Sequence, residues 1–169
     1  MNIAILSTYY PRECGIASFS KDLRENLMLW GEQVSILAIS DKCGLYNYPK
    51  EVVFELEEEK RDHYTIAAEF ANTSDIDLVF VEHEYGIFGG SDGEYVLDFV
   101  ESLKKPFILN THTVLPTPEF HKRRILSKLG QKATAVICMT HRSAELLNKV
   151  YNIPRGKIYM VHHGVPEFQ

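Results

Sequence analysis

The chain has 169 residues, of which 45% are apolar, and carries a formal net charge of −5. This length supports one domain of ordinary size, and the apolar share is sufficient for a core, which excludes a disordered chain. The acidic balance disfavours nucleic acid or an anionic membrane surface as the main partner, although it is compatible with peripheral membrane contact. No apolar run approaches the ~20 residues of a membrane-spanning helix.

The three cysteines are Cys14, Cys43 and Cys138. They are too few and too scattered for a disulfide framework, and the absence of a Cys-x-x-Cys pair disfavours a structural zinc site. An odd number of thiols suits a reducing compartment. Met1 leads straight into the first predicted strand, without the pattern of a secretory signal. We therefore expect a cytoplasmic protein.

Short apolar runs predict strands at residues 2–7, 33–39, 52–56, 76–81, 107–110, 135–139 and 157–161. Apolar residues at helical spacing predict helices at residues 15–30, 61–71, 93–103, 119–132 and 141–151. This alternation favours a mainly parallel sheet of about seven strands with helices on both faces. The predicted fold class is α/β, a single Rossmann-like three-layer α/β/α domain.

The helical spacing also predicts which side chains face the sheet. In the first helix these are Ile16, Phe19, Leu23 and Leu27. In the second helix we expect Ile66, Ala67 and Phe70 to form the buried face.

The first candidate site is the loop Pro11–Gly15, between the first strand and its helix. A helix N-terminus offers unpaired N–H groups and the positive end of the helix dipole, and glycine lets an anion approach the backbone. The loop is therefore a candidate phosphate cradle, although it matches neither the dinucleotide nor the Walker motif. The alternative is that Gly15 merely serves the turn.

The second candidate site follows the buried strand that ends near Val81. Three ionisable residues come directly after it, namely Glu82, His83 and Glu84, and glycines follow at Gly86, Gly89, Gly90 and Gly93. Either glutamate would orient the His83 ring and raise its pKa. Tyr85 and Phe88 offer flat surfaces for stacking on a ring-shaped ligand. The alternative is an ordinary surface loop in which these aromatics pack.

The third candidate site is the segment from Asn110 to Thr113, with His112 placed as a general base or a hydroxyl-positioning group. The alternative is a hydrogen-bonded structural histidine. His121 follows one turn into the next helix, without metal-ligand spacing, so we expect no metal. Loops that follow parallel strands share one edge of a sheet, so we expect Gly15, His83 and His112 to line one groove.

Together these motifs resemble a known family. The segments are Pro11–Phe19, His83–Gly90 with Asp92–Tyr95, Thr111–Pro116 and His163–Pro166. In this order they are similar to the amino-terminal half of GT-B glycosyltransferases, specifically the family 4 (group 1) retaining enzymes, and look mannosyltransferase-like. The resemblance covers essentially the whole chain, and His163–Pro166 looks like the segment where that half meets the hinge.

The resemblance implies an acceptor-side domain that faces a second, donor-binding domain across a cleft. It implies that Cys14, Gly15 and Ile16 approach the diphosphate of a GDP- or UDP-sugar, and that His112 lies beside the transferred sugar. It places the acceptor near a set of residues on the other two loops, namely His83, Glu84, Tyr85, Gly86, Phe88, Thr111, Thr113 and His121. No metal cofactor is implied.

A complete enzyme of this family is about twice as long, and its second domain carries a Glu-x7-Glu donor motif that is absent here. We therefore expect residues 1–169 to form the amino-terminal domain, to fold alone, and to be inactive without its partner domain. Two other interpretations stay open. One is a stand-alone module that binds sugar or phosphate without catalysis, and the other is half of an epimerase or a phosphorylase.

Overall fold

The structure, a computed structural model, describes residues 1–164. The strands are β1 (Asn2–Ser7), β2 (Gln33–Ser40), β3 (Val52–Glu57), β4 (Leu78–His83), β5 (Phe107–Thr111), β6 (Ala135–Cys138) and β7 (Ile158–Met160). The α-helices are α1 (Gly15–Leu29), α2 (Arg61–Thr73), α3 (Val96–Ser102), α4 (Phe120–Lys132) and α5 (His141–Lys149). Short 3₁₀ turns lie at Tyr85–Ile87, Ser91–Gly93 and Arg155–Lys157. The α/β prediction is confirmed.

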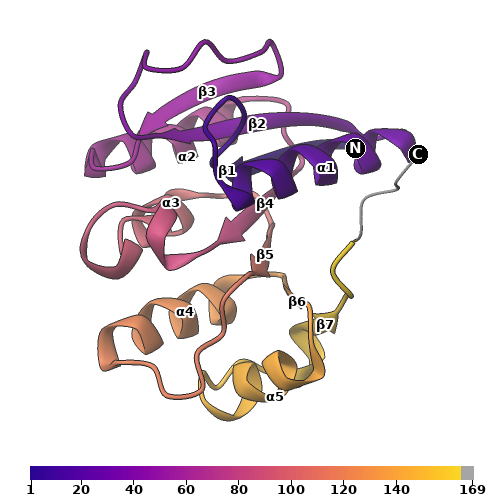
Figure 1. Cartoon of the computed structure of the whole chain (residues 1–169), viewed down its shortest axis with the longest axis vertical. Coiled ribbons are helices and arrows are strands. Elements are labelled where there is room, and N and C mark those ends of the chain that lie inside the picture. The colour runs from indigo at the N-terminus through magenta and orange to yellow at the C-terminus, as the bar shows by residue number, and fades with distance from the viewer. Residues whose placement is uncertain (165–169) are drawn as a thin grey trace.

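The strands form one seven-stranded sheet in the order β3-β2-β1-β4-β5-β6-β7, with parallel pairing throughout the described residues (Figure 1). The chain begins in the interior of the sheet and moves outward through α1 to β2 and then β3. It crosses back through α2 to β4 and continues outward in the opposite direction. The order therefore reverses between β1 and β4, and such a switch point is where open α/β sheets bind ligands.

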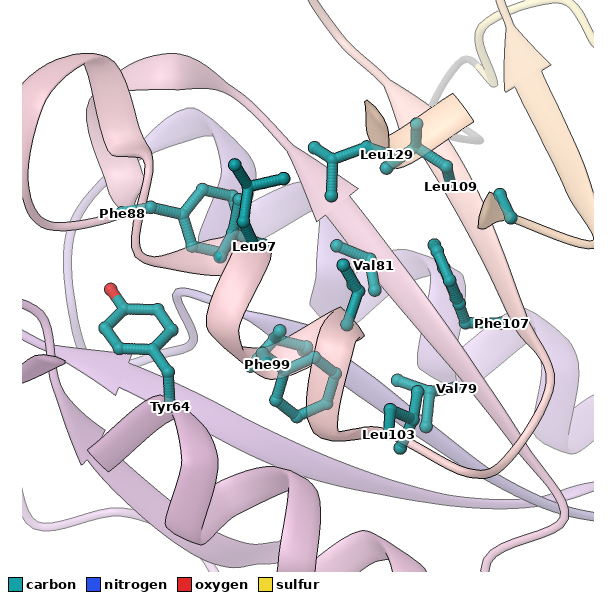
Figure 2. Close-up of a cluster of buried hydrophobic side chains, with 14 of the residues drawn as sticks. Tyr64, Val79, Val81, Phe88, Leu97, Phe99, Leu103, Phe107, Leu109 and Leu129 are labelled. Atoms are coloured by element: carbon teal, nitrogen blue, oxygen red, sulfur yellow. The ribbon is translucent and has the colours of Figure 1, made fainter. Parts of the chain in front are cut away.

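The reversal also sorts the helices between the two faces, because right-handed crossovers in opposite directions lie on opposite faces. α2, α3, α4 and α5 cover one face, where Val79 and Val81 of β4 pack against Phe99 of α3 and Leu129 of α4 (Figure 2). Burying these strands between two layers explains why they read as nearly continuous apolar runs.

The opposite face holds a smaller core. Ile3 and Ile5 of β1 and Phe80 of β4 are buried there, and Leu23 and Leu27 of α1 pack against them half-buried. Along β5, β6 and β7 this face is more open. Ile108 and Ile137 are half-buried, and Tyr159 is exposed.

The expected sheet-facing side of α1 is confirmed for Ile16, Leu23 and Leu27, which pack half-buried against the cores, whereas one expectation for α2 needs correction. In α1 the buried residues are Ala17 and Ser20, because the helix lies close enough to the sheet for small side chains to fill the contact. Ile16 and Phe19 are only half-buried. In α2 the residues Tyr64, Ala67, Ala68 and Ala71 face the core. Ile66 lies on the outer side and is 50% exposed, so its predicted burial is wrong.

The third helix is also shorter than predicted. Residues 91–93 form a 3₁₀ turn in which Asp92 has a positive φ of 56°, so that regular α-helix starts only at Val96. None of the helices in residues 1–164 combines the length and the apolar character needed to cross a bilayer.

Candidate functional site

The three candidate loops all leave the carboxyl edge of the sheet. β1, β4 and β5 are adjacent parallel strands, and the loops at Thr8–Cys14, after His83 and after Thr111 follow directly from them. The predicted common edge is therefore confirmed, and it lies at the switch point between β1 and β4.

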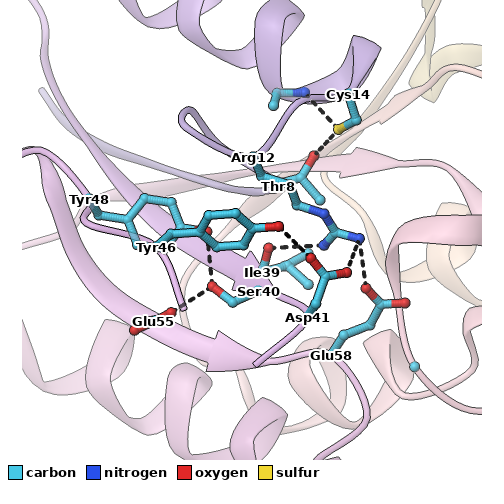
Figure 3. Close-up of polar contacts among 12 residues, drawn as sticks. Thr8, Arg12, Cys14, Ile39, Ser40, Asp41, Tyr46, Tyr48, Glu55 and Glu58 are labelled. Carbon is cyan, nitrogen blue, oxygen red and sulfur yellow. Dashed lines mark hydrogen bonds and ion pairs between the residues drawn. The ribbon is translucent and has the colours of Figure 1, made fainter. Parts of the chain in front are cut away.

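The loop after β1 leaves the N-terminus of α1 open. Cys14 caps the helix, because its Sγ accepts a hydrogen bond from the Ala17 amide at 3.4 Å and contacts Thr8 Oγ1 at 3.1 Å (Figure 3). Among residues 1–164 no acceptor binds the amides of Gly15 or Ile16. Gly15 is exposed, its φ is not positive, and a Cβ there would meet nothing within 4 Å, so the turn itself does not require glycine.

Arg12 anchors this loop to the neighbouring strands. Its guanidinium donates to the carbonyl of Ile39 at 3.2 Å and pairs with Asp41 at 2.9 Å and Glu58 at 3.0 Å (Figure 3). The Arg12 side chain is largely buried, so the ion pairs hold the loop against the ends of β2 and β3. This anchoring role was not predicted from the sequence.

An open hollow of about 370 Å³ lies beside the same loop and α1. It is lined by Tyr10, Arg12, Glu13, Cys14, Ala17, Ser18, Lys21 and Asp22. A second hollow of about 230 Å³ is lined by residues that include Asn2, Gln33 and Asp75, at the amino ends of the strands. Only the first adjoins the predicted phosphate cradle.

His112 lies at the rim on the α1 side of the sheet. Its Nε2 is 2.7 Å from Oε2 of Glu82, and the side-chain amide of Asn110 donates to the same oxygen at 2.8 Å. Glu82 is fully buried, whereas the His112 side chain is 10% exposed. The Phe19 ring packs edge-on against the His112 ring, with centroids 4.8 Å apart, and also contacts the exposed His163.

Phe19 was not predicted as a site residue. Glu82 was expected to orient His83 rather than His112, and Asn110 was included in the third candidate segment without a role. Glu82 and Asn110 are register partners on β4 and β5, so their side chains lie on the same face of the sheet. His112 lies two residues beyond Asn110 and therefore shares that face. This alternation was readable from the sequence once the two strands were paired.

His83 points to the opposite face and is 1% exposed. Its ring packs edge-on against Tyr85 and stacks with Phe88, at centroid distances of 4.8 and 6.2 Å. Burial, with a smaller contribution from the charge of His112, lowers the pKa of His83 to about 3. The predicted increase in its pKa is therefore wrong, because Glu82 lies on the other face. The prediction that His83 lines the groove is also wrong.

The rest of the loop after β4 is packed rather than open. Tyr85 and Phe88 are buried, so the alternative of loop packing replaces the predicted stacking surfaces. A Cβ on Gly89 would lie 2.0 Å from the carbonyl oxygen of Glu58. Gly93 has a φ of +80°, and a Cβ there would lie 2.7 Å from the Tyr85 carbonyl oxygen. These glycines serve close packing, whereas Gly86 is exposed.

The two threonines that flank His112 also differ in exposure, since one is buried and the other reaches the surface. Thr111 is buried and donates its hydroxyl hydrogen to the carbonyl of Ile137 at 2.8 Å. Thr113 is half-buried and donates to Glu84, whose other carboxylate oxygen accepts from the Tyr85 amide at 2.9 Å. Thr113 and Glu84 therefore connect the loops after β4 and β5 at the rim.

His121 of α4 lies between two carboxylates of the loop before α3. Its Nδ1 is 3.2 Å from Asp92 and its Nε2 is 3.1 Å from Glu94, while Lys122 also pairs with Asp92 at 3.5 Å. The half-buried ring thus connects α4 to the glycine-bearing segment between β4 and α3, residues 84–95, which we call the glycine loop. No group of three His, Cys, Asp or Glu side chains in residues 1–164 is arranged to hold a metal ion.

The predicted hinge segment is only partly described. His163 and Gly164 lie within the described residues, whereas Val165 and Pro166 lie outside them.

Known protein structures show the same fold. A glycosyltransferase from Rickettsia africae ESF-5 aligns with a TM-score of 0.65 at 14% identity, over 97% of this chain and 43% of that one. An alpha-glucosyltransferase in complex with UDP and DNA that contains an HMU base aligns with a TM-score of 0.64 at 16% identity, over 95% of this chain and 41% of that one. An alpha-glucosyltransferase in complex with UDP-glucose and DNA with an abasic site aligns with a TM-score of 0.63 at 15% identity, over 95% and 42%.

This chain therefore spans less than half the length of these structures. No curated protein matches the sequence. The family model for Glycosyltransferase Family 4 matches residues 15–167. Since that match covers most of the chain, including the candidate loop residues from Gly15 onward, the chain belongs to Glycosyltransferase Family 4.

Proposed function

We propose that this chain is the acceptor-side, amino-terminal domain of a retaining family 4 glycosyltransferase. The enzyme would move a mannose- or glucose-type sugar from a GDP- or UDP-sugar to a glycan, lipid or small-molecule acceptor. One observation carries the proposal: the open N-terminus of α1 and the imidazole of His112 share one sheet edge, at the switch point of a family 4 fold.

The donor diphosphate would bind at the N-terminus of α1. The amides of Gly15 and Ile16 are free to donate, and the positive end of the helix dipole favours an anion there. Cys14 contributes by capping the helix through its Sγ, which leaves those two amides available. Solved structures of the same fold contain UDP or UDP-glucose, which supports a nucleotide sugar as the donor.

The transferred sugar would lie beside His112, which positions its hydroxyl groups. The acceptor would approach the neighbouring rim, where Glu84, Gly86 and Thr113 reach the surface and His121 holds the glycine loop. The buried residues of these loops would then shape the site from beneath without touching the acceptor, namely His83, Tyr85, Phe88 and Thr111.

We further propose that a carboxyl-terminal donor-binding domain completes the enzyme, because similar solved chains extend to more than twice this length. The isolated chain would then be inactive. The free thiols of Cys14, Cys43 and Cys138 fit a cytoplasmic enzyme.

The experiment uses radiolabelled UDP-glucose and GDP-mannose with the isolated 169-residue chain and with the full-length protein that contains it. We expect sugar transfer or slow donor hydrolysis by the full-length protein, and neither by the isolated chain. Calorimetry on the isolated chain should detect binding of an acceptor glycan but little binding of the nucleotide. If the isolated chain bound the nucleotide tightly and the full-length protein transferred no sugar, the result would instead indicate a binding module without catalysis.

A further inference from the structure

The buried carboxylate of Glu82 approaches His112 at one defined atom. Oε2 of Glu82 is 2.7 Å from Nε2 of the imidazole, a distance typical of a charge-assisted hydrogen bond. A carboxylate only accepts, so Nε2 must carry the hydrogen in this contact. In the neutral ring the single proton then sits on Nε2, and Nδ1 is left as an acceptor.

Glu82 is itself held in place. The carboxylate is fully buried, and Asn110 donates a second hydrogen bond to the same Oε2 at 2.8 Å. Glu82 and Asn110 are register partners in the middle of the sheet, so the backbone fixes their separation. The other oxygen, Oε1, has no hydrogen-bond partner among the described residues, so both donors converge on Oε2.

The plane of the His112 ring is fixed as well. The Phe19 ring of α1 meets it edge-on at an interplanar angle of 87°. Nδ1 makes no hydrogen bond within residues 1–164 and is not among the buried polar atoms without a partner, so it reaches solvent. One ring nitrogen of His112 is thus held from beneath, and the other is left available at the rim.

We propose that Glu82 is a positioning residue that holds the proton of neutral His112 on Nε2 and so presents Nδ1 as a hydrogen-bond acceptor for a sugar hydroxyl. The sugar in this statement rests on the proposed function, whereas the position of the proton does not. Asn110 supports the arrangement by sharing Oε2. In this role Glu82 only accepts hydrogen bonds. The arrangement therefore requires an acceptor oxygen at residue 82, and it does not require a negative charge there.

The test is nitrogen NMR of histidine side chains in the 169-residue chain at about pH 9, where imidazoles are neutral. In the wild-type chain we expect His112 to be a single tautomer protonated at Nε2. Glu82→Met removes the acceptor at similar volume, and we expect it to give a mixture of tautomers. Glu82→Gln keeps a carbonyl oxygen for both donors and should preserve the wild-type tautomer. Glu84→Met is the control, because Glu84 bonds to Thr113 instead.

A wild-type ring that is protonated on Nδ1, or that is already a mixture, would overturn the proposal without any variant. An unchanged tautomer in a folded Glu82→Met chain would overturn it as well. In the full-length protein we expect Glu82→Met to lower kcat by about 10- to 100-fold with a smaller change in KM, the range seen when partners that orient metal-bound histidines are removed. Glu82→Gln should restore most of kcat. The expected tautomers without any sugar transfer would overturn the proposed function and support the placement of the proton.

Discussion

His83 and His112 lie at the ends of neighbouring strands, yet their environments are opposite. His83 is enclosed by aromatic rings on the face that carries four helices, and burial lowers its pKa to about 3. His112 lies on the face that carries α1 and reaches the rim, where Glu82 contacts it from beneath. Sharing an edge of the sheet therefore does not place two side chains in one site, because they must also share a face.

The two glycine-bearing loops differ in the same sense. The loop before α1 leaves backbone amides open at Gly15, where added side-chain atoms would meet nothing. The loop after β4 uses Gly89 and Gly93 to let backbone segments pack closely. Glycine thus gives access to a helix N-terminus in the first loop and permits dense packing in the second.

The largest effect expected of a single substitution at neutral pH tests the packed loop. Gly89→Ala would force a Cβ to within 2.0 Å of the Glu58 carbonyl oxygen, so the loop must shift. We expect a loss of about 3 kcal/mol in the free energy of unfolding, measured by urea denaturation. Gly86→Ala is the matched control, since a Cβ there meets nothing within 4 Å, and it should be nearly neutral. Equal effects of the two substitutions would show that the loop after β4 is not packed as described.

The second prediction concerns the pH dependence of the free energy of unfolding, which tests whether His83 is buried. Its pKa in the folded chain, about 3, lies below the ordinary value of 6.5, so the unfolded chain binds the extra proton between these pH values. The stability from this group is therefore complete above about pH 6.5 and is lost as pH falls toward 3. Wild-type stability should drop more steeply than that of His83→Phe, by about 1.4 kcal/mol per pH unit near pH 4 to 5.

This difference is read from urea denaturation of both chains at several pH values. The carboxylates titrate in both chains, so the difference between the curves isolates His83. Curves that stay parallel from pH 7 to 4 would mean that the His83 ring is accessible and protonates in the folded chain.

The smallest effect concerns His121, which links α4 to the glycine loop. Replacing it with glutamine removes its contacts with Asp92 and Glu94, which are ion pairs when the imidazole is protonated, and because these groups are partly exposed we expect a loss of only about 0.5–1 kcal/mol. The loss should shrink in high salt, as measured by thermal unfolding. His141→Gln serves as the control because His141 is exposed, and it should change little. An effect of His121→Gln that is independent of salt would contradict the ion-pair assignment.

The alternation of strands and helices was sufficient to predict the fold, because buried parallel strands and amphipathic helices leave strong periodic patterns. The common edge of the three loops followed from the same pattern. The positions of individual side chains did not follow from this pattern. His83 was predicted as a site residue because it is flanked by carboxylates, but in a strand the flanking residues point to the opposite face.

Long-range contacts explain the remaining differences. Arg12 reaches Asp41 and Glu58, which lie far from it in the sequence, and the packing of Gly89 depends on Glu58 in the same way. The pairing of Glu82 with His112 needed the register between β4 and β5. None of these contacts leaves a local signal that a single sequence could reveal.

The most direct test compares His112→Ala with His83→Phe in sugar transfer by the full-length protein. The proposed site predicts that His112→Ala loses kcat by about 100-fold or more, because a group beside the reacting sugar is removed. It predicts that His83→Phe keeps kcat within about threefold, since a buried ring replaces a buried ring. Loss of transfer in folded His83→Phe, with transfer retained in His112→Ala, would contradict the placement of the site on the α1 side of the sheet.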